Sequence, residues 1–175
     1  MRAYILPTGN EILEGIVLDL DGPEIMRQIV AAWPDAEVTR AAPTVDEEDR
    51  IFQRICRTAE SGPDLIVLIG GSAGGRRFSS TLGKDYTHTA LVRYLDEYSA
   101  REIYGKNGHM WSKLVCGRKG GTLVINVPGP FEEAKAAMQA CIRGMQQDCG
   151  VEEISRRMAQ AVFEKYPKGA ASLAE

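Results

Sequence analysis

The residue types best suited to chemistry lie in one stretch of this chain, residues 64–91. There a short apolar strand, Leu65–Ile69, ends abruptly in the sequence Gly-Gly-Ser-Ala-Gly at positions 70–74. A strand that stops at glycines lets a ligand approach the backbone closely, because no side chain stands in the way. The N–H groups of the following loop and helix then face the negative charge of the ligand. This pattern predicts an anion-binding site.

A basic loop separates these glycines from the next predicted helix. It carries Arg76, Arg77 and Lys84, and Asp85 stands two residues before Thr87. Cations and a carboxylate in one loop indicate an anion together with a metal or proton partner. Two plainer interpretations stay open. Loop arginines are usually solvated although they suit phosphate, and an acid at a helix start commonly caps the helix.

Strands and helices alternate along the chain. The predicted strands cover residues 3–6, 36–41, 65–69, 114–116 and 122–127. The predicted helices start near residue 23 and then cover about residues 46–61, 87–98, 131–145 and 151–166. Alternating elements with continuous apolar strands predict a three-layer α/β/α fold with a mainly parallel central sheet.

The remaining segments are predicted to be irregular. We expect one domain over residues 1–166 and a flexible tail over residues 167–175. Asn10 and Glu11 lie in a predicted loop, and residues 99–113 have no clear period and stay unassigned.

Several of the predicted loops should meet at one edge of the sheet. In parallel sheets, ligands bind beyond the carboxyl ends of the strands. That rule gathers the loops at residues 8–15, 43–47, 70–85 and 128–131. The sequence therefore predicts a single site built from four segments.

Composition limits the classes of partner. The chain has 175 residues, of which 44% are hydrophobic and 26% charged, and its net charge of -3 argues against general nucleic-acid binding. The four cysteines form no C-x-x-C pair, which favours buried free thiols in a reducing compartment. No signal peptide and no apolar run of roughly 20 residues is found, so we expect a cytoplasmic protein without a membrane partner.

Common nucleotide and catalytic motifs are missing. Gly83-Lys84 is followed by Asp85 rather than by serine or threonine, so there is no P-loop. Neither a G-x-G-x-x-G nor a G-x-S-x-G sequence occurs. The two histidines, His88 and His109, have no neighbour at zinc-ligand spacing.

A set of short segments carries a family resemblance. They are TGNEILEG at residues 8–15, DLD at 19–21, TVDE at 44–47, GGSA at 70–73, DYTHTA at 85–90 and NVPGP at 126–130. In this order they resemble the MoaB/Mog molybdopterin-binding domain family. The family includes molybdopterin adenylyltransferases, the central domain of molybdotransferases and the amino-terminal domain of CinA-type proteins. The first two segments are most similar to the CinA and molybdotransferase branch.

The resemblance implies a site for molybdopterin, a phosphate-bearing pterin, or a related nucleotide, in molybdenum cofactor biosynthesis. Adenylyltransferase members use Mg-ATP, so the resemblance also allows Mg²⁺ and ATP as cofactors. Asp46 and Asp85 match functional carboxylates of the family and are the candidate catalytic residues and Mg²⁺ ligands. The candidate binding residues are Thr8, Gly9, Asn10, Glu11, Gly70, Gly71, Ser72, Ala73, Gly74, Thr87, Pro128 and Gly129.

This chain departs from the family pattern in its binding loops. Asn10 replaces an aspartate, and Ala73 replaces a glycine, which makes a positive φ costly there. The loop between Gly74 and Asp85 is longer than usual and could cover or fill the site.

The departures leave several functions open. Adenylyl transfer to molybdopterin is the lead enzymatic hypothesis. The alternatives are a non-catalytic pterin or nucleotide carrier or sensor, a CinA-like nucleotide phosphohydrolase, and an interacting subunit with a filled pocket. The resemblance also implies a homo-oligomer, either a trimer or a dimer.

Overall fold

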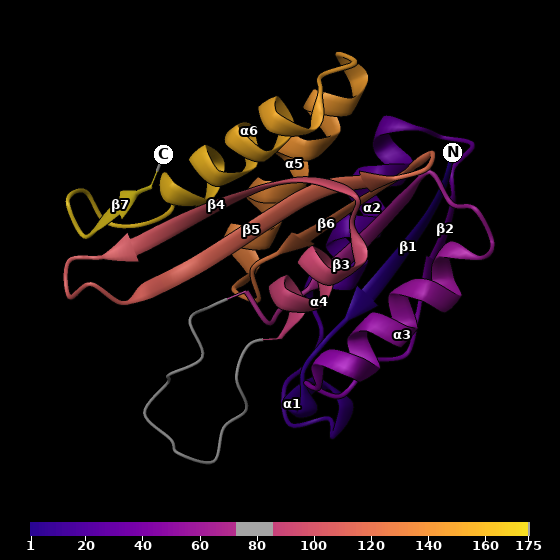
Figure 1. Cartoon of the computed structure of the whole chain (residues 1–175), viewed down its shortest axis with the longest axis horizontal. Coiled ribbons are helices and arrows are strands. Elements are labelled where there is room, and N and C mark those ends of the chain that lie inside the picture. The colour runs from indigo at the N-terminus through magenta and orange to yellow at the C-terminus, as the bar shows by residue number, and fades with distance from the viewer. Residues whose placement is uncertain (73–85, 175) are drawn as a thin grey trace.

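The computed structural model describes residues 1–72 and 86–174. The strands in these residues are β1 (Arg2–Pro7), β2 (Glu37–Arg40), β3 (Leu65–Ile69), β4 (Glu97–Gly105), β5 (Met110–Lys119), β6 (Thr122–Val127) and β7 (Ala171–Leu173). They form one sheet in the order β2-β1-β3-β6-β5-β4-β7 (Figure 1).

The sheet has a parallel half and an antiparallel half. Strands β2, β1, β3 and β6 run parallel, with Ala3 opposite Leu65 and Leu65 opposite Leu123. Strands β5, β4 and β7 extend the sheet beyond β6 in antiparallel pairings. The segments predicted as strands at residues 114–116 and 122–127 pair with each other as the β5–β6 hairpin.

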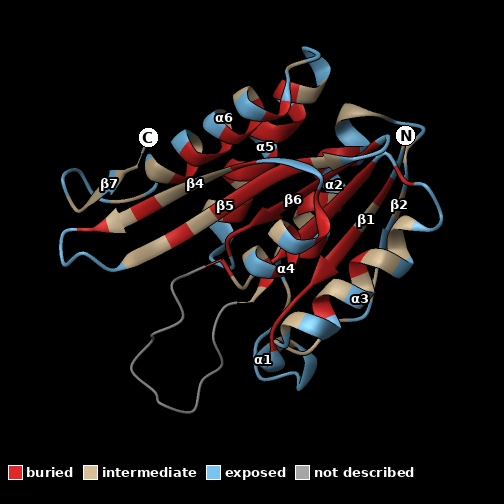
Figure 2. Cartoon of the chain, in the orientation of Figure 1, coloured by how far each residue is buried: buried red, intermediate tan, exposed pale blue. Residues whose placement is uncertain are grey.

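Helices cover both faces of this sheet. Their bounds are α1 (Asn10–Leu13), α2 (Asp21–Ala32), α3 (Glu48–Ala59), α4 (Thr87–Tyr94), α5 (Phe131–Gln146) and α6 (Val151–Phe163). Apolar side chains of α2, α5 and α6 pack on one face, and those of α3 and α4 pack on the other (Figure 2). The predicted three-layer α/β/α fold is therefore confirmed.

The strand sequences explain why both faces are covered. Successive side chains of a strand point to opposite faces, and every residue of β3 is buried. Leu65, Val67 and Ile69 belong to the core below α2, α5 and α6. Ile66 and Leu68 belong to the core below α3 and α4. Such a continuous apolar strand is stable only between two helical layers.

Two local predictions differ from the structure. Asn10 and Glu11 open the short helix α1 instead of an irregular loop. Helix α4 ends at Tyr94 rather than near residue 98. The Lys119 ammonium accounts for this end, because it donates to Tyr94 O and to the Asp96 carboxylate, both at 3.0 Å. A cation that binds the last carbonyl groups stabilises a helix terminus.

The unassigned segment and the expected tail both join the sheet. Residues 99–113 fall within β4, β5 and their connection, although their mixed polar sequence lacks a strand period. The tail predicted to be flexible pairs with β4 through β7, with Ile103 opposite Leu173. The apolar side of Leu173 packs on the core near α6, which gives this short strand a reason to dock.

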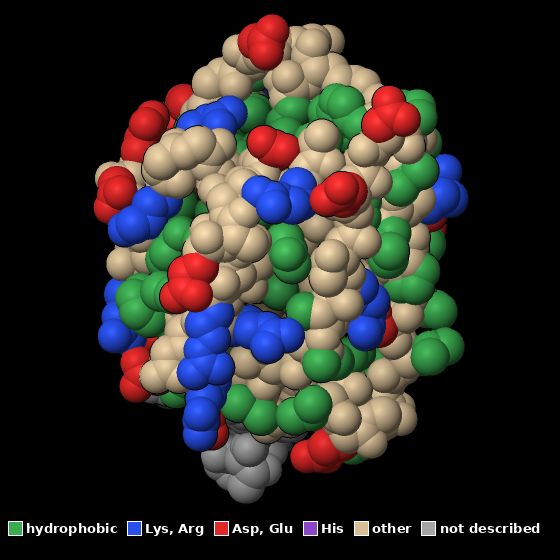
Figure 3. All heavy atoms as spheres, turned by 90° about the vertical axis from the view of Figure 1, so that its right-hand side faces the viewer, with side chains coloured by type: hydrophobic (Ala, Val, Ile, Leu, Met, Phe, Trp, Pro, Cys, Tyr) green, Lys and Arg blue, Asp and Glu red, His purple; other side chains and the backbone are tan. Residues whose placement is uncertain are grey.

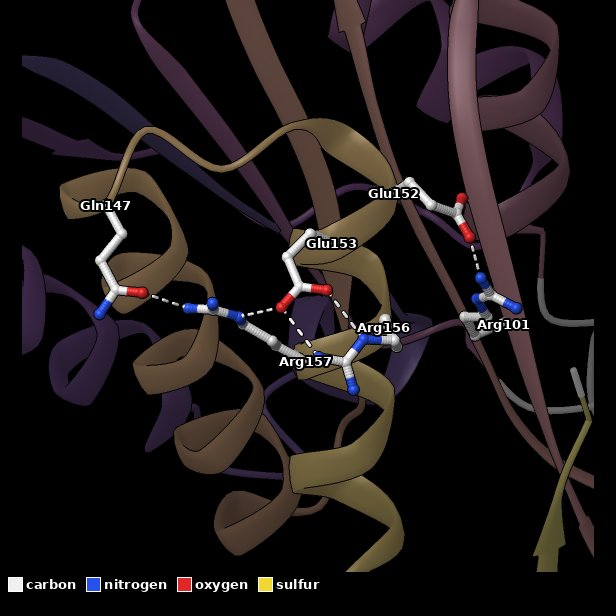
Figure 4. A network of polar contacts seen from close by, with 6 residues as sticks. All are labelled: Arg101, Gln147, Glu152, Glu153, Arg156 and Arg157. Carbon is white, nitrogen blue, oxygen red and sulfur yellow. Dashed lines mark hydrogen bonds and ion pairs between the residues drawn. The ribbon is translucent and has the colours of Figure 1, made fainter.

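Helix α6 is fixed to its neighbours by charged side chains (Figure 4). The Glu153 carboxylate accepts from Arg156 at 2.8 Å and from Arg157 at 2.6 Å. Arg157 also donates to the Gln147 side chain beyond the end of α5 at 2.6 Å. Arg101 of β4, the strand that α6 covers, pairs with Glu152 at the start of α6.

The cysteines are free thiols, as predicted, and Cys116 and Cys141 are buried. None of the helices in the described residues is long and apolar enough to cross a membrane.

Candidate functional site

The predicted loops meet where the parallel strands end (Figure 1). Thr8 N–H donates to Ile69 O at 2.9 Å, and Gly70 N–H donates to Val127 O at 3.1 Å. Thr8 also forms a parallel bridge with Thr44. The ends of β1, β3 and β6 and the segment after β2 are therefore adjacent, as the topology rule predicts.

A pair of buried threonines connects β1 with α4. The Thr8 hydroxyl donates to Ile69 O at 2.9 Å and lies 2.9 Å from the Thr87 hydroxyl. Because the Thr8 hydroxyl has a single hydrogen, Thr87 is the donor in the second contact. These bonds hold the start of α4 against the end of β1.

The two glycines after β3 are required by packing. Gly71 has a φ of +59°, and a Cβ added there would lie 2.2 Å from Thr87 Oγ1. Gly70 has a φ of +88°, and its Cβ would lie 3.0 Å from Thr8 O. The missing side chains thus make room for Thr8 and Thr87, and not only for a ligand. Gly129 lies on the other side of Gly70, with its added Cβ 3.9 Å from Gly70 Cα.

The amino terminus of α4 lies beside these glycines. Thr87 N is 3.2 Å from the position of the added Gly71 Cβ. The N-cap residue, Tyr86, makes no side-chain cap. His88 Nδ1 lies 3.4 Å from Gly71 O. The first-turn N–H groups of an eight-residue helix provide partial positive charge at this point.

Acidic and amide side chains lie on the opposite side of Thr8. Gly9 has a φ of +127°, and the Glu11 carboxylate covers it, with Oε1 3.0 Å from the added Cβ. Asn10 Oδ1 accepts the backbone N–H of Asp46 at 3.1 Å. Gly9 N–H donates to Thr44 O at 3.1 Å. The first and second predicted loops are therefore joined, and Asp46 lies next to Asn10.

A polar cluster on β4 and β5 adjoins Ser72. The Ser72 carbonyl oxygen accepts the Lys113 backbone N–H at 2.6 Å. Lys113 Nζ lies 2.7 Å from the Glu102 carboxylate, which also accepts from the Tyr104 hydroxyl. The hydrogen bonds from Lys113 and Tyr104 lower the pKa of Glu102. The electrostatic interaction with His88 acts in the same direction.

Sequence reasoning missed three of these neighbours. His88 lies in the DYTHTA segment but was not singled out there, and Lys113 lies in the unassigned residues 99–113. Only the fold brings them to Gly71 and Ser72. Thr44 was inside a loop expected at the site, but its bridge to Thr8 was not foreseen.

Comparison with known proteins identifies the family. Residues 4–147 match the MoCF_biosynth family, described as a probable molybdopterin binding domain. The chain belongs to this family. A search of curated proteins found no match.

Solved structures share the fold of this molybdopterin binding domain. The match with the molybdopterin biosynthesis enzyme MoaB from Thermus thermophilus covers 93% of this chain and 96% of the MoaB chain, with a TM-score of 0.64 and 22% sequence identity. The match with a CinA protein of unknown function from Thermoplasma acidophilum covers 84% of this chain and 96% of the CinA chain, with a TM-score of 0.58 and 18% sequence identity. The match with the tungsten cofactor synthesizing protein MoaB from Pyrococcus furiosus covers 84% of this chain and 93% of the matched chain, with a TM-score of 0.59 and 13% sequence identity.

Some predicted residues of the domain lie outside the described residues. These are Ala73, Gly74 and Asp85, together with the basic loop that carries Arg76, Arg77 and Lys84. In residues 1–72 and 86–174, no group of three histidine, cysteine, aspartate or glutamate residues is arranged to hold a metal ion. The pairing of Asp46 with Asp85 around Mg²⁺ therefore stays a prediction.

One predicted role needs correction. Gly70, Gly71 and Ser72 were expected to hold phosphate through their backbone N–H groups. The Gly70 N–H instead donates to Val127 O within the sheet, so it is not available to a ligand. Pro128 is buried beneath this turn, and the exposed Gly129 forms the surface beside Gly70.

Proposed function

We propose that this chain binds molybdopterin, or a closely related phosphate-bearing pterin, where β1, β3 and β6 end, and that it acts in molybdenum cofactor biosynthesis. Family membership over residues 4–147 supports the class of ligand. The main support for placing the ligand at these strand ends is the contact between Gly71 and Thr87. It sets the first turn of α4 beside the strand ends, where backbone N–H groups suit a phosphate.

The acidic side chains of the site suit adenylyl transfer, the reaction that the family resemblance implies. In adenylyl transfer, an oxygen of the pterin phosphate attacks the α-phosphorus of ATP, and pyrophosphate leaves. Asp46 and Asp85 are the residues of this chain that would hold Mg²⁺ for that step, in which positioning and charge neutralisation do most of the catalysis. Glu11, whose carboxylate covers Gly9, adds a third acid next to Thr8.

Asn10 favours a role confined to binding. The family motif has an aspartate at this position, and Asn10 carries no negative charge with which to attract a cation. Its side-chain oxygen is already engaged with the backbone N–H of Asp46. A carrier or sensor of the pterin is accordingly the second candidate function.

Titration calorimetry with molybdopterin prepared without oxygen tests the binding proposal. We expect saturable binding that Thr87→Val weakens at least about tenfold, a loss of about 1.4 kcal/mol, because the hydroxyl that orders the start of α4 is removed. Glu37→Gln is the control. Glu37 lies opposite Arg2 in the β1–β2 register, at the amino-terminal ends of these strands and so away from the site. Failure of the wild-type protein to bind contradicts the proposal.

A second assay separates the candidate activities. Release of pyrophosphate from Mg-ATP in the presence of molybdopterin supports adenylyl transfer, and Asp46→Asn and Asp85→Asn should abolish it. Binding without release supports the carrier or sensor. Release of AMP from ADP-ribose instead indicates the CinA-like phosphohydrolase.

A further inference from the structure

The segment from the end of α1 to the start of α2 exposes a run of large apolar side chains. Between 47% and 78% of the surface of each is exposed in Leu13, Ile16, Val17, Leu18 and Leu20. Single exposed apolar residues are ordinary, whereas a contiguous set of them marks a contact surface. The candidate pterin site does not account for them, because none of its contacts involves these side chains.

The backbone of this segment is held in place. The N–H groups of Ile16 and Val17 donate to Glu11 O at 2.9 and 3.1 Å. Asp19 accepts from the Arg40 guanidinium at 2.6 Å and from a backbone N–H of α2 at 2.8 Å. The apolar side chains are therefore presented on an ordered backbone, and a partner would not bear the entropy of ordering it.

Three arginines of α3 lie on the surface next to this apolar segment. Arg50, Arg54 and Arg57 border a hollow of about 240 Å³ on α3. Arg50 reaches the Glu47 carboxylate only at 3.8 Å. Arg54 and Arg57 form no ion pair with any residue that the structure describes. Among the described residues, no carboxylate oxygen lies within 4 Å of the Arg54 or Arg57 guanidinium, so these two arginines leave positive charge on this helix face.

The apolar segment and the arginines are continuous. Leu13 lines the arginine hollow, and the adjacent Ile12 lines a second hollow with Ile16, Val17 and Leu18. In the face shown in Figure 3, basic and hydrophobic side chains are prominent together in the lower half. Arginine beside a cluster of apolar side chains is the composition enriched in protein contact surfaces.

We propose that residues 13–20 and the three arginines of α3 form one docking surface for a protein segment that carries carboxylates beside large apolar side chains. The charge of Arg54 and Arg57 selects the acidic partner, and the apolar segment supplies the buried area. This proposal goes beyond the pterin site. Because α1 begins at Asn10, a segment seated on the docking surface would lie at the rim of that site.

A symmetric contact with a second copy of this chain matches these charges less well. In an isologous dimer the same patch is used by both subunits. Within residues 13–20, Glu14 is the exposed acid, whereas Asp19 is engaged with Arg40. One exposed carboxylate per copy does not balance three arginines, so an occupant with more carboxylates fits the surface better.

Selection from a displayed library of random twelve-residue peptides tests the proposal on the full chain. We expect enrichment of sequences that combine aspartate or glutamate with leucine, isoleucine or phenylalanine. Leu18→Asp and the double variant Arg54→Glu/Arg57→Glu should each weaken the dissociation constant of an enriched peptide at least tenfold. Molybdopterin affinity should not change, which separates this test from that of the proposed function.

Matched controls lie on other faces. Val30→Asp places an acid at an exposed apolar position of α2, and Arg143→Glu reverses an exposed arginine of α5. Both should change peptide affinity less than twofold. Circular dichroism should show that all the variants keep the wild-type fold, because every changed side chain is at least partly exposed.

Three results would overturn the docking surface. One is enrichment of peptides without acidic residues or without apolar residues. Another is peptide affinity that Leu18→Asp and the arginine variant leave intact. The third is a sedimentation experiment in which either variant changes the oligomeric state, since the surface would then be covered by a second copy.

Discussion

Gly71 shows how one missing side chain sets the geometry of the candidate site. Its φ of +59° disfavours any other residue, and its Cα faces the Thr87 hydroxyl at close range. The sequence correctly indicated that glycine was needed after β3. It could not indicate that the space would be filled by a threonine from α4, because that contact joins residues separated by the basic loop.

Gly71→Ala should therefore destabilise the domain through both backbone and packing. Gly120→Ala is a matched control, because Gly120 has a φ of +58° but nothing lies within 4 Å of the added Cβ. We expect a loss of about 1 kcal/mol for the control and at least about 3 kcal/mol for Gly71→Ala, measured by urea unfolding. Equal losses would contradict the close packing of Gly71 against Thr87.

Asp21 makes stability depend on pH. Burial at the start of α2, and then the charge of Asp19, raise the pKa of Asp21 to about 6. An unfolded aspartate titrates near 3.9, so between about pH 4 and pH 6 the folded state binds more protons than the unfolded state. The contribution of Asp21 to the free energy of unfolding should therefore fall as pH rises through this window and stay constant above it.

Asp21→Asn should remove that contribution. Urea unfolding at pH 4, 5, 6 and 7 measures the difference between the variant and the wild-type protein. Asp35→Asn, at an exposed position, is the control and should keep the wild-type profile. A wild-type slope in Asp21→Asn would contradict the assignment.

Among the elements, those with a strong apolar period were the predictable ones. Strands β1, β3 and β6 and helices α2, α3, α5 and α6 all appear close to the predicted residues. Strand β4 could not be recognised, because neither of its faces is consistently apolar. One face carries Ser99, Arg101 and Ile103, and the other has Glu102 between two tyrosines. It is a strand because β5 pairs with its full length and α6 covers it.

Strand β7 should protect the edge of the sheet. Its backbone pairs with β4, and Ala174 N–H also donates to Glu102 O at 2.9 Å. A chain shortened to end at Lys168 leaves the β4 edge unpaired, and unpaired edges promote association between sheets. We expect earlier aggregation on heating, followed by light scattering.

The full-length variant Leu173→Ser is the control for this truncation. It loses the apolar side chain but keeps the backbone pairing of β7. It should aggregate at a temperature close to that of the wild-type protein. If it aggregates as early as the shortened chain, the side chain of Leu173 matters more than the edge itself.

In the molecule as a whole, the parallel half of the sheet carries the candidate site and the antiparallel half supports it from one side. The topology rule was enough to predict that the loops at residues 8–15, 43–47, 70–85 and 128–131 would gather at one edge, and the described parts of these loops do so. It was silent on Lys113 and Glu102, because both lie in residues 99–113, which the sequence left unassigned and which form parts of β4 and β5.

The unequal burial of the four thiols has a practical consequence. Burial raises the pKa of Cys116 to about 12 and that of Cys141 well above its ordinary value, so neither forms the thiolate that alkylating reagents attack. Cys56 and Cys149 are only partly covered. A Cys149→Ser protein therefore accepts a single fluorophore at Cys56, next to Arg57 in the chain, where its emission can report the arrival of a partner on α3.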